Sequence, residues 1–479
     1  MKKYLYTLIF CCIPVTAQWQ ADVRLTFNSA ISNTSFNNAR CIAVSAQTIH
    51  VVWYDNRDGN YEIYYKRSTD AGSVWSPDIR LTNNSFESRS PSISLSGSNV
   101  YVVWQDTRDG NWEIYFKSST DAGVNWGSDI RLTNNASSSE EPSAASAGSF
   151  IHIVWVDTRD GNPEIYYKLS SDNGLTWSSD VRHNFSIQNT FEPSVAVSGS
   201  NVHVVRSDDM LNSYFEIFYR RSSNNGINWS VDTNLTYNSI SVVKNPCIAI
   251  TGSRVNVVWS QQIGNNYEIF FKGSSNGGIN WGANLQLTNH TGHSIYPSIA
   301  RSDSIIHIVW QDIRDGNNEI YYIVSTNNGI TWGAETRLTN NNAVSQYPSV
   351  AISDSAVHVL WCDNRDGNYE IYYKRNPTGN IIGIQKISTE IPKDFGLYQN
   401  YPNPFNPETS IEFDIPVYSS VRLSVYDLTG REVGTLVNNY LSPGKYKVRW
   451  NAGMYSSGMY IYRIEAGNYT DTKKFVFLK

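Results

Sequence analysis

Residues 91–126 read PSISLSGSNVYVVWQDTRDGNWEIYFKSSTDAGVNW, and this stretch recurs along the chain with small changes. Seven copies align, and their mean spacing of about 51 residues is typical of a repeat architecture. The second predicted strand of each unit ends in the same aligned position, which is occupied by Trp53, Trp104, Trp155, Arg206, Trp259, Trp310 and Trp361. A period this regular predicts a fold assembled from seven similar units.

Each unit contains four short strand-like runs, separated by Gly, Asn, Asp and Ser residues that favour turns. In the quoted copy and the residues after it, the runs are 91–95, 100–104, 113–118 and 130–133. Several runs are apolar at consecutive positions, as expected for sheets covered on both faces. Four short antiparallel strands form one blade of a β-propeller, so each unit predicts one blade.

The N-terminus supplies the strand that the last unit lacks. Val23-Arg24-Leu25-Thr26 matches the fourth run of a unit but precedes any first run, whereas the seventh unit ends without a fourth run. Pairing the two would close the ring and leave no exposed sheet edge. We therefore predict an all-β fold whose residues 18–388 form a seven-bladed propeller of four-stranded blades; six or eight blades fit the count less well.

The ends of the chain and its composition restrict where the protein works. Residues 1–17 resemble a secretory signal peptide, with Lys2 and Lys3 before an apolar stretch and Ala17 at a plausible cleavage site. No later segment reaches the roughly 20 apolar residues of a transmembrane helix. The net charge of −5 and the lack of a basic stripe argue against nucleic-acid binding.

Three cysteines follow the predicted signal peptide, namely Cys41, Cys247 and Cys362. An odd number excludes a complete set of intramolecular disulfides. Cys41 and Cys247 occupy a position where the other five units carry serine, which favours a small buried side chain over a reactive thiol.

The turn between the third and fourth runs carries Ser-x-Asp-x-Gly-x-x-Trp, complete at 68–75, 119–126 and 170–177. It resembles the Asp box of bacterial neuraminidases, and the resemblance covers about 360 residues, which implies a sialidase-like propeller. We expect the Asp to accept backbone N–H bonds, the Gly to adopt unusual angles and the Trp to cover the blade beneath. The structural Asp-box residues are Asp70, Trp75, Asp121, Trp126, Asp172 and Trp177, and three further copies carry Asn224, Asn276 and Asn327.

The resemblance implies the fold more strongly than sialidase activity. In that family the box is a structural turn away from the active site, which is marked by an Arg triad, an acid/base Asp, a Tyr nucleophile supported by Glu, and an Arg-Ile-Pro tripeptide. The chain has no Arg-Ile-Pro, every candidate Arg lies inside a repeated unit, and sialidases usually have six blades. A non-enzymatic role is therefore favoured over hydrolysis.

A second motif, Asp-x-Arg-Asp-Gly-Asn, lies between the second and third runs, on the opposite face from the Asp boxes. One interpretation is structural, with an Asp-Gly hairpin turn and Arg57 paired to Asp55 or Glu62. The other is a multivalent surface whose Arg forks and aromatic rings bind carboxylated glycans or protein. The candidate ligand-binding residues are Asp55, Arg57, Asp106, Arg108, Asp157, Arg159, Asp312, Arg314, Asp363, Arg365 and Trp112.

Metal binding is not predicted. One position of the second run carries His50, His152, His203, His307 and His358. These histidines belong to different blades, and packed sheets are about 10 Å apart, so we expect packing positions and not a shared ion. Calcium in the Asp-x-Arg loop is a weaker alternative, because Arg stands where an EF-hand needs Asp or Asn. No other cofactor is predicted.

The repeat stops after Ile387, and we predict a linker at 389–398 and a separate domain at 399–479. Alternating runs at 410–415, 421–426, 446–450 and 459–464 indicate a small immunoglobulin-like β-sandwich. With VYDLTG at 425–430, SGMY at 457–460 and KKFVFLK at 473–479, the domain resembles the type A sorting domain of type IX secretion. The resemblance implies export by the type IX machinery of a Bacteroidota-like bacterium and an extracellular or outer-membrane surface location; an ordinary adhesive domain is the alternative.

The sequence as a whole favours an exported propeller that acts as a carbohydrate- or protein-binding module. A sialidase-like exo-glycoside hydrolase is one alternative, since a glycosidase needs only two suitably spaced carboxylates. A structural cell-surface protein without a small ligand is the other.

Overall fold

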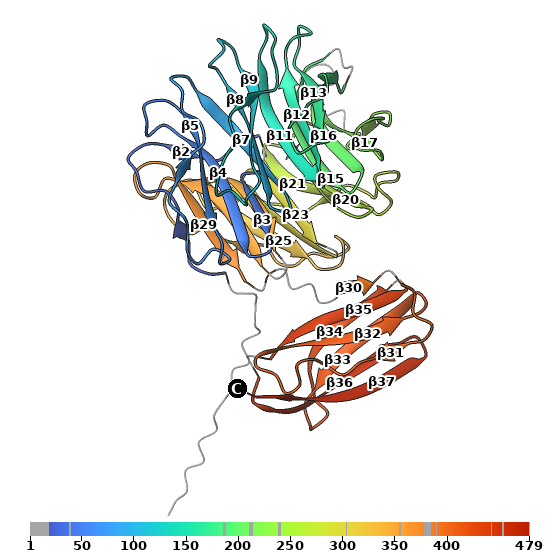
Figure 1. Ribbon diagram of the computed structural model, residues 1–479. Coiled ribbons are helices and arrows are strands. Elements are labelled where there is room, and N and C mark those ends of the chain that lie inside the picture. The colour runs from blue at the N-terminus through green and yellow to red at the C-terminus, as the bar shows by residue number, and fades with distance from the viewer. Residues whose placement is uncertain are drawn as a thin grey trace, which may run out of the picture. The chain divides into compact units, whose positions relative to one another are not determined.

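The computed structural model describes residues 19–37, 40–184, 188–209, 214–237, 241–302, 304–353, 356–377, 379, 385–388, 390–441, 443–452 and 455–478. The predicted signal peptide lies outside the described residues. The chain divides into two compact units, residues 1–380 and 381–479, and all named elements are strands (Figure 1). The predicted all-β fold is confirmed.

Seven sheets, here called blades 1 to 7, make up the described part of the first unit. Blade 1 contains β2 (Ser32–Asn33), β3 (Ile42–Ser45), β4 (Thr48–Asp55), β5 (Glu62–Ser68) and β6 (Ile79–Arg80). Blade 2 contains β7 (Ser88–Ser96), β8 (Asn99–Asp106), β9 (Glu113–Ser119) and β10 (Ile130–Arg131). Blade 3 contains β11 (Ser139–Ala147), β12 (Phe150–Asp157), β13 (Glu164–Ser170) and β14 (Val181–Arg182). Blade 4 contains β15 (Thr190–Ser198), β16 (Asn201–Asp209), β17 (Phe215–Ser222) and β18 (Thr233–Asn234).

Blade 5 contains β19 (Val243–Thr251), β20 (Arg254–Ile263), β21 (Asn266–Ser274) and β22 (Leu285–Gln286). Blade 6 contains β23 (Ser294–Ser302), β24 (Ile305–Asp312), β25 (Glu319–Ser325) and β26 (Thr336–Arg337). Blade 7 contains β27 (Ser345–Ile352), β28 (Val357–Asp363), β29 (Glu370–Asn376) and the N-terminal β1 (Val23–Arg24). In the second unit, one sheet contains β30 (Gln385–Ser388), β31 (Gly396–Leu397), β32 (Glu408–Ile415) and β35 (Gly444–Asn451). The other contains β33 (Ser419–Tyr426), β34 (Glu432–Leu441), β36 (Gly458–Ala466) and β37 (Tyr469–Phe477).

The ring closes through the N-terminus, as the sequence predicts. β1 pairs antiparallel with β29, with Val23 opposite Tyr373. Trp19 adds a second contact, because its ring meets Tyr322 of blade 6 edge to face at 5.0 Å. The N-terminal segment therefore supplies both the outer strand of blade 7 and an aromatic contact to the blade before it.

The Asp-box tryptophans, expected to cover the blade beneath, contact the preceding blade. Trp126 of blade 2 meets Tyr65 of blade 1 edge to face at 4.9 Å. The same contact is made by Trp75 with Tyr373, Trp177 with Phe116, Trp229 with Tyr167, Trp281 with Tyr219 and Trp332 with Phe271. Trp19 with Tyr322 completes the series, since blade 7 has no Asp box of its own. Edge-to-face aromatic pairs thus link every blade to the next.

The Asp boxes themselves form as predicted. Asp70 Oδ1 accepts backbone N–H bonds from Ser73 at 3.0 Å and Val74 at 2.8 Å. Gly72 has φ +90°, and a Cβ there would lie 2.5 Å from the Tyr373 hydroxyl oxygen. Glycine is needed here both for the backbone angle and for the approach of the preceding blade.

The repeated histidines are packing residues, as expected. The Nδ1 atom of His152 lies 2.8 Å from the hydroxyl of Tyr167, and both side chains are buried. The same pair occurs as His50 with Tyr65, His203 with Tyr219, His307 with Tyr322 and His358 with Tyr373. Burial lowers the pKa of His152 to about 4, so the ring is neutral at pH 7.

The three cysteines are buried and form no disulfide. Burial raises the pKa of the Cys41 thiol to about 11 and that of Cys362 to about 12. A buried thiol with a raised pKa is unreactive, which agrees with the predicted packing role.

The second unit packs its two sheets around a core that includes Phe413, Trp450, Tyr462 and Phe475, and so forms the predicted β-sandwich. It begins earlier than the sequence indicates. Residues 385–388, assigned above to the propeller, form β30 and pair with β35, and the predicted linker contains β31. The repeat pattern could not reveal this, because these short strands are defined by hydrogen bonds to distant partners.

Candidate functional site

The first Asp of each Asp-x-Arg-Asp-Gly-Asn motif is buried inside its blade. Asp312 is 0% exposed and accepts five hydrogen bonds. They come from Ser294 Oγ at 2.8 Å, from Trp310 Nε1 at 2.9 Å, and from the backbone N, Nε and Nη2 of Arg314. Burial opposes ionisation, but these bonds outweigh it and hold the pKa of Asp312 below its usual value.

The motif arginines are held between two acidic side chains. Arg57 donates to Asp55 and to Asp78, each at 2.6 Å, and its guanidinium lies 4.3 Å from the centre of the Tyr64 ring. Asp78 also pairs with Lys66 at 2.8 Å. The same arrangement joins Arg108 to Asp106 and Asp129, Arg159 to Asp157 and Asp180, Arg314 to Asp312 and Glu335, and Arg365 to Asp363 and Asp22.

The ten candidate Asp and Arg residues therefore form five separate sets of ion pairs, one in each of five blades. We call these sets the ion-pair clamps, because each ties the turn to the outer strand of its blade. In blade 4 the buried Arg206 replaces Trp and pairs with Asp208 at 3.0 Å. Trp112 is half-buried beside the blade 2 clamp, and its carbonyl accepts the Ser139 N–H at 2.8 Å. The geometry matches the structural interpretation of the motif and does not gather these residues into one pocket.

A different set of residues surrounds the propeller axis on the same face. A β-bulge interrupts the first strand of blades 2 to 7 just before the repeated proline, for example between Arg89 and Ser92. The bulged residues have φ between 51° and 56° and are Ser90, Glu141, Glu192, Asn245, Tyr296 and Tyr347. We call these six residues the axial ring. Bulges and left-handed non-glycine residues are frequent at functional sites, where they re-aim side chains.

The ring is connected by hydrogen bonds on one side. Glu141 Oε2 accepts the backbone N–H of Glu192 at 3.1 Å. Glu192 in turn accepts the backbone N–H of Asn245 at 2.6 Å and its Nδ2 at 2.7 Å. A carboxylate has about four acceptor positions, so both glutamates retain acceptor capacity toward a ligand.

Tyrosines form the other side of the ring. The rings of Tyr296 and Tyr347 meet edge to face with centroids 4.9 Å apart. Tyr54 and Tyr369 pack against the same core cluster as Tyr347, and the ring centroids of Tyr54 and Tyr61 lie 5.4 Å apart. Burial and the nearby Tyr347, Glu192 and Glu141 raise the pKa of Tyr296 to about 12.

The two glutamates ionise near neutral pH. Burial and the charge of Glu192 raise the pKa of Glu141 to about 7, and burial raises that of Glu192 to about 7 as well. Carboxyl groups with such pKa values can donate or accept a proton at physiological pH. In the described residues, no group of three His, Cys, Asp or Glu side chains could hold a metal ion.

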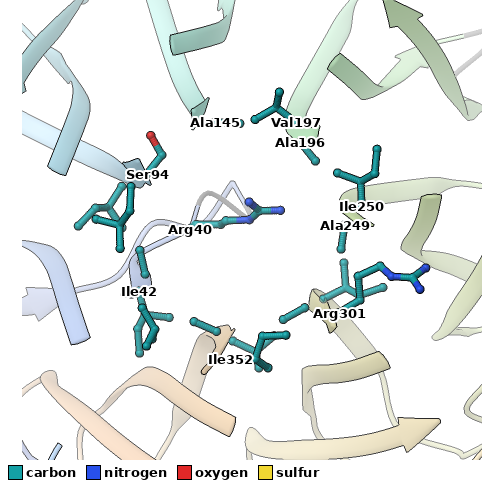
Figure 2. A pocket seen from close by; sticks show the side chains of 18 of the residues that line it. Arg40, Ile42, Ser94, Ala145, Ala196, Val197, Ala249, Ile250, Arg301 and Ile352 are labelled. Carbon is teal, nitrogen blue, oxygen red and sulfur yellow. The ribbon is translucent and has the colours of Figure 1, made fainter. Parts of the chain in front are cut away.

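Below the ring, the first strands enclose an axial cavity of about 250 Å³. Its wall is mostly aliphatic, with Ile42, Ala145, Ala196 and Ile250 among the lining residues (Figure 2). Arg40 extends toward the middle of the cavity and donates to the Ile248 carbonyl at 2.9 Å across the axis (Figure 2). Arg40 therefore partly blocks the channel beneath the axial ring.

The axial ring was missed in the sequence because its members differ between units. The position before the repeated proline carries Ser, Glu, Glu, Asn, Tyr and Tyr in blades 2 to 7. A single binding site on a pseudosymmetric ring needs residues that differ between the blades. The variation at this one position of a well-repeated unit was therefore the signal that the sequence offered.

Comparison with protein families identifies the second unit. Residues 399–478 match the family model of the secretion system C-terminal sorting domain. The predicted type IX sorting domain is thus confirmed, and the protein is exported to the cell surface or beyond it. No helix long and apolar enough to cross a membrane occurs in the described part of the chain.

Comparisons also relate the propeller to known proteins. A sialidase of Clostridium perfringens is 26% identical over 152 residues, covering 24% of this chain and 40% of that protein, so the chain spans less than half of this relative. Among solved structures, the polysaccharide lyase Uly1 has a TM-score of 0.52 at 8% identity and covers 75% of this chain and 99% of the lyase. A Trypanosoma rangeli sialidase has a TM-score of 0.42 at 12% identity and covers 83% of this chain and 84% of its own. The likeness to the lyase concerns the fold alone.

Proposed function

We propose that this exported protein is a carbohydrate-binding propeller whose ligand sits on the axial ring. The observation that carries the proposal is the break in the repeat at this ring. Most repeated positions agree between the blades, whereas the bulged positions bring Glu141, Glu192, Asn245, Tyr296 and Tyr347 together once, at the axis. Non-equivalent residues on a rigid repeated scaffold are what one specific binding site requires.

The chemistry of the ring suits a sugar. Two carboxyl groups and an amide offer hydrogen bonds to hydroxyl groups, and the tyrosines offer flat apolar faces with polar tips. The relative named as a sialidase supports a carbohydrate ligand for the propeller. The sorting domain is consistent with this role, because export by the type IX machinery would place the ring outside the cell.

Changes to the ring side chains should weaken binding without unfolding the protein. On a glycan array, we expect the mature chain to bind a defined subset of glycans. Glu192→Gln and Tyr296→Phe should each weaken binding to that subset about tenfold or more, since hydrogen bonds to charged groups contribute roughly 1.5–3 kcal/mol.

Tyr214→Phe is the matched control, because Tyr214 is exposed outside the ring and should leave binding unchanged. Glycan binding that survives both ring substitutions would contradict the proposal, as would binding only to a protein ligand.

Hydrolysis is the second candidate, favoured by one specific observation. Glu141 accepts the backbone N–H of Glu192 at 3.1 Å, both glutamates have pKa values of about 7, and Tyr296 belongs to the same axial ring. Assays with aryl sialosides and other aryl glycosides distinguish the two roles. Turnover that Glu141→Gln abolishes would establish an enzyme, whereas glycan binding without turnover supports the binding module. A purely structural protein would show neither.

A further inference from the structure

Aromatic side chains gather just outside the axial ring, at the position before the buried glutamate near the start of each third strand. Blades 3 and 6 carry Pro163 and Asn318 at this position. The other five blades carry an aromatic residue, and all five side chains are half-buried. We call them the outer aromatics: Tyr61, Trp112, Phe215, Tyr267 and Tyr369.

Backbone pairing places three of the outer aromatics close to the inner strand of the next blade. The Tyr61 carbonyl accepts the N–H of Ser88 at 2.7 Å, and Ser88 lies two residues before the ring member Ser90. The Trp112 carbonyl accepts the N–H of Ser139 at 2.8 Å, again two residues before a ring member. The Tyr369 carbonyl accepts the N–H of Ser32 at 2.8 Å. These side chains therefore lie on the same face of the propeller as the axial ring.

The outer aromatics form two groups on opposite sides of the axis. The inner strands of consecutive blades contact one another, and β27 contacts β3, so the seven blades follow one another around a closed ring. Tyr369, Tyr61 and Trp112 belong to blades 7, 1 and 2, whereas Phe215 and Tyr267 belong to blades 4 and 5. In a ring of seven blades, the point opposite blade 1 lies between blades 4 and 5. A line from one group to the other therefore crosses the axial ring.

Tyrosines connect the first group to the axial ring. The ring centroids of Tyr61 and Tyr54 lie 5.4 Å apart, and Tyr54 packs with Tyr347 and Tyr369 against one core cluster. Tyr347 in turn meets Tyr296 at 4.9 Å. All five side chains are half-buried, so part of each faces solvent. An aromatic surface thus extends from blade 1 to the axis.

The second group is joined to the axial ring by neighbours in the sequence. Phe191 comes directly before one of the ring glutamates, and its ring centroid lies 6.3 Å from that of Phe215. Lys244 comes directly before Asn245 of the ring, and its ammonium group lies 4.3 Å from the centre of the Tyr267 ring. Aromatic side chains therefore continue on the far side of the axis.

A cation holds one outer aromatic in each group. The Arg89 guanidinium lies 4.2 Å from the centre of the Tyr61 ring, as Lys244 does at 4.3 Å from that of Tyr267. His293 Nδ1 also accepts the backbone N–H of Tyr267 at 3.2 Å. Such contacts orient the aromatic rings before a ligand arrives, which lowers the cost of ordering them on binding.

We propose that the axial ring and the outer aromatics together bind an internal stretch of an extended polysaccharide, which crosses the axis from blade 1 toward blades 4 and 5. Sugar rings lie against the outer aromatics at both ends, and the carboxyl groups and amide of the axial ring bind hydroxyl groups in the middle. This inference rests on the proposed function and names the class of its ligand. A single terminal sugar would need the axial ring alone, whereas two aromatic groups on opposite sides of it suit a chain of several sugars.

The test is calorimetric titration of the mature full-length chain with disaccharides and octasaccharides prepared from xylan, laminarin, chitin and alginate. We expect at least one octasaccharide to bind about fiftyfold or more tightly than its disaccharide, because only the longer chain reaches both groups of outer aromatics. An octasaccharide contains seven overlapping disaccharides, so statistics alone would give a gain of roughly sevenfold.

Two variants test the two ends separately. Tyr61→Asn and Tyr267→Asn each introduce the residue that blade 6 carries as Asn318, so the fold should tolerate them. Each should lower the affinity for the octasaccharide about tenfold and leave the affinity for the disaccharide unchanged. Tyr401→Asn is the control, because it removes an exposed tyrosine of the second unit and should leave both affinities unchanged. The urea midpoint of each variant shows whether it is folded.

The outcomes separate this inference from the proposed function. Glu192→Gln should weaken disaccharide and octasaccharide binding alike, since both ligands contact the axial ring. The inference is wrong if every octasaccharide gains sevenfold or less, or if Tyr61→Asn and Tyr267→Asn both keep the unaltered affinity. It is also wrong if a glycan on the array needs the axial ring while none of the four octasaccharides binds; the proposed function then stands. Absence of all glycan binding would overturn both.

Discussion

Replacing Asp312 by alanine should lower the free energy of unfolding by about 3–5 kcal/mol, as for other buried ion pairs that lose one partner. The change would leave Trp310 Nε1 and Ser294 Oγ without an acceptor and the Arg314 guanidinium without its buried partner. Each unsatisfied buried group costs about 1–3 kcal/mol, so the effect has several sources, which are coupled through one carboxylate.

Urea denaturation followed by tryptophan fluorescence measures this effect. The control is Glu87→Ala, which removes a half-exposed carboxylate paired with Arg89 and should cost less than about 1 kcal/mol. If Asp312 were instead a ligand-binding residue, its loss would reduce glycan binding and leave the urea midpoint unchanged. That result would restore the multivalent-surface interpretation of the motif.

Acidification should destabilise the propeller strongly between about pH 6.5 and pH 4. Burial lowers the pKa of His50, His152 and His203 to about 4 and that of His358 to about 3. Unfolded histidine has a pKa of about 6.5, so the unfolded chain binds more protons in this range and stability falls as pH falls. Each of the first three histidines contributes about 3 kcal/mol that is fully present above pH 6.5 and lost by pH 4.

Other charges act on the same transition. Arg67, Arg221 and Arg375 also lower the pKa of the histidines beside them. Glu141 and Glu192 act in the opposite direction, because their raised pKa values make the folded chain bind more protons between pH 7 and 4.5. Two carboxyl groups offset only part of the effect of the histidines, so the net result is a loss of stability.

The measurement is the urea midpoint at half-unit steps from pH 7.5 to pH 4. The variant His203→Asn with Tyr219→Phe introduces the pair that blade 5 already carries as Asn256 and Phe271. This variant should fold. Its free energy of unfolding should depend less on pH, by about one proton or at most about 1.4 kcal/mol per pH unit. If the slope of the urea midpoint against pH were unchanged in this variant, the buried histidines would not be the source of the pH dependence.

Much of the fold could be predicted because the evidence is local and repeated. Each strand is encoded by its own residues and turns, and seven copies reduce the ambiguity of any single one. The N-terminal Val23-Arg24-Leu25-Thr26 was recognised as an outer strand from the same pattern, and β1 pairs with β29 accordingly. The sorting domain was recognised from motifs in its last 80 residues or so.

The candidate site could not be predicted in the same way. The repeated Asp312 and Arg314 attracted attention because charged loop residues resemble a binding surface, yet their partners Trp310, Ser294 and Glu335 bury and neutralise them. The pattern of the sequence does not reveal whether a charge is paired. Pairing depends on which side chains the outer strand brings to the turn.

The repeat in the amino-acid sequence was therefore sufficient for the all-β propeller and its closure, since backbone pairing and turn geometry depend on neighbouring residues. The motifs of the last 80 residues or so were sufficient for the export domain. Only the tertiary structure decided the roles of the side chains. It joined the Asp-box tryptophans to the preceding blades and turned the bulged Glu141 and Glu192 toward one axis. These juxtapositions involve residues about 50 positions or more apart, and they arise from the curvature of the ring and not from local sequence.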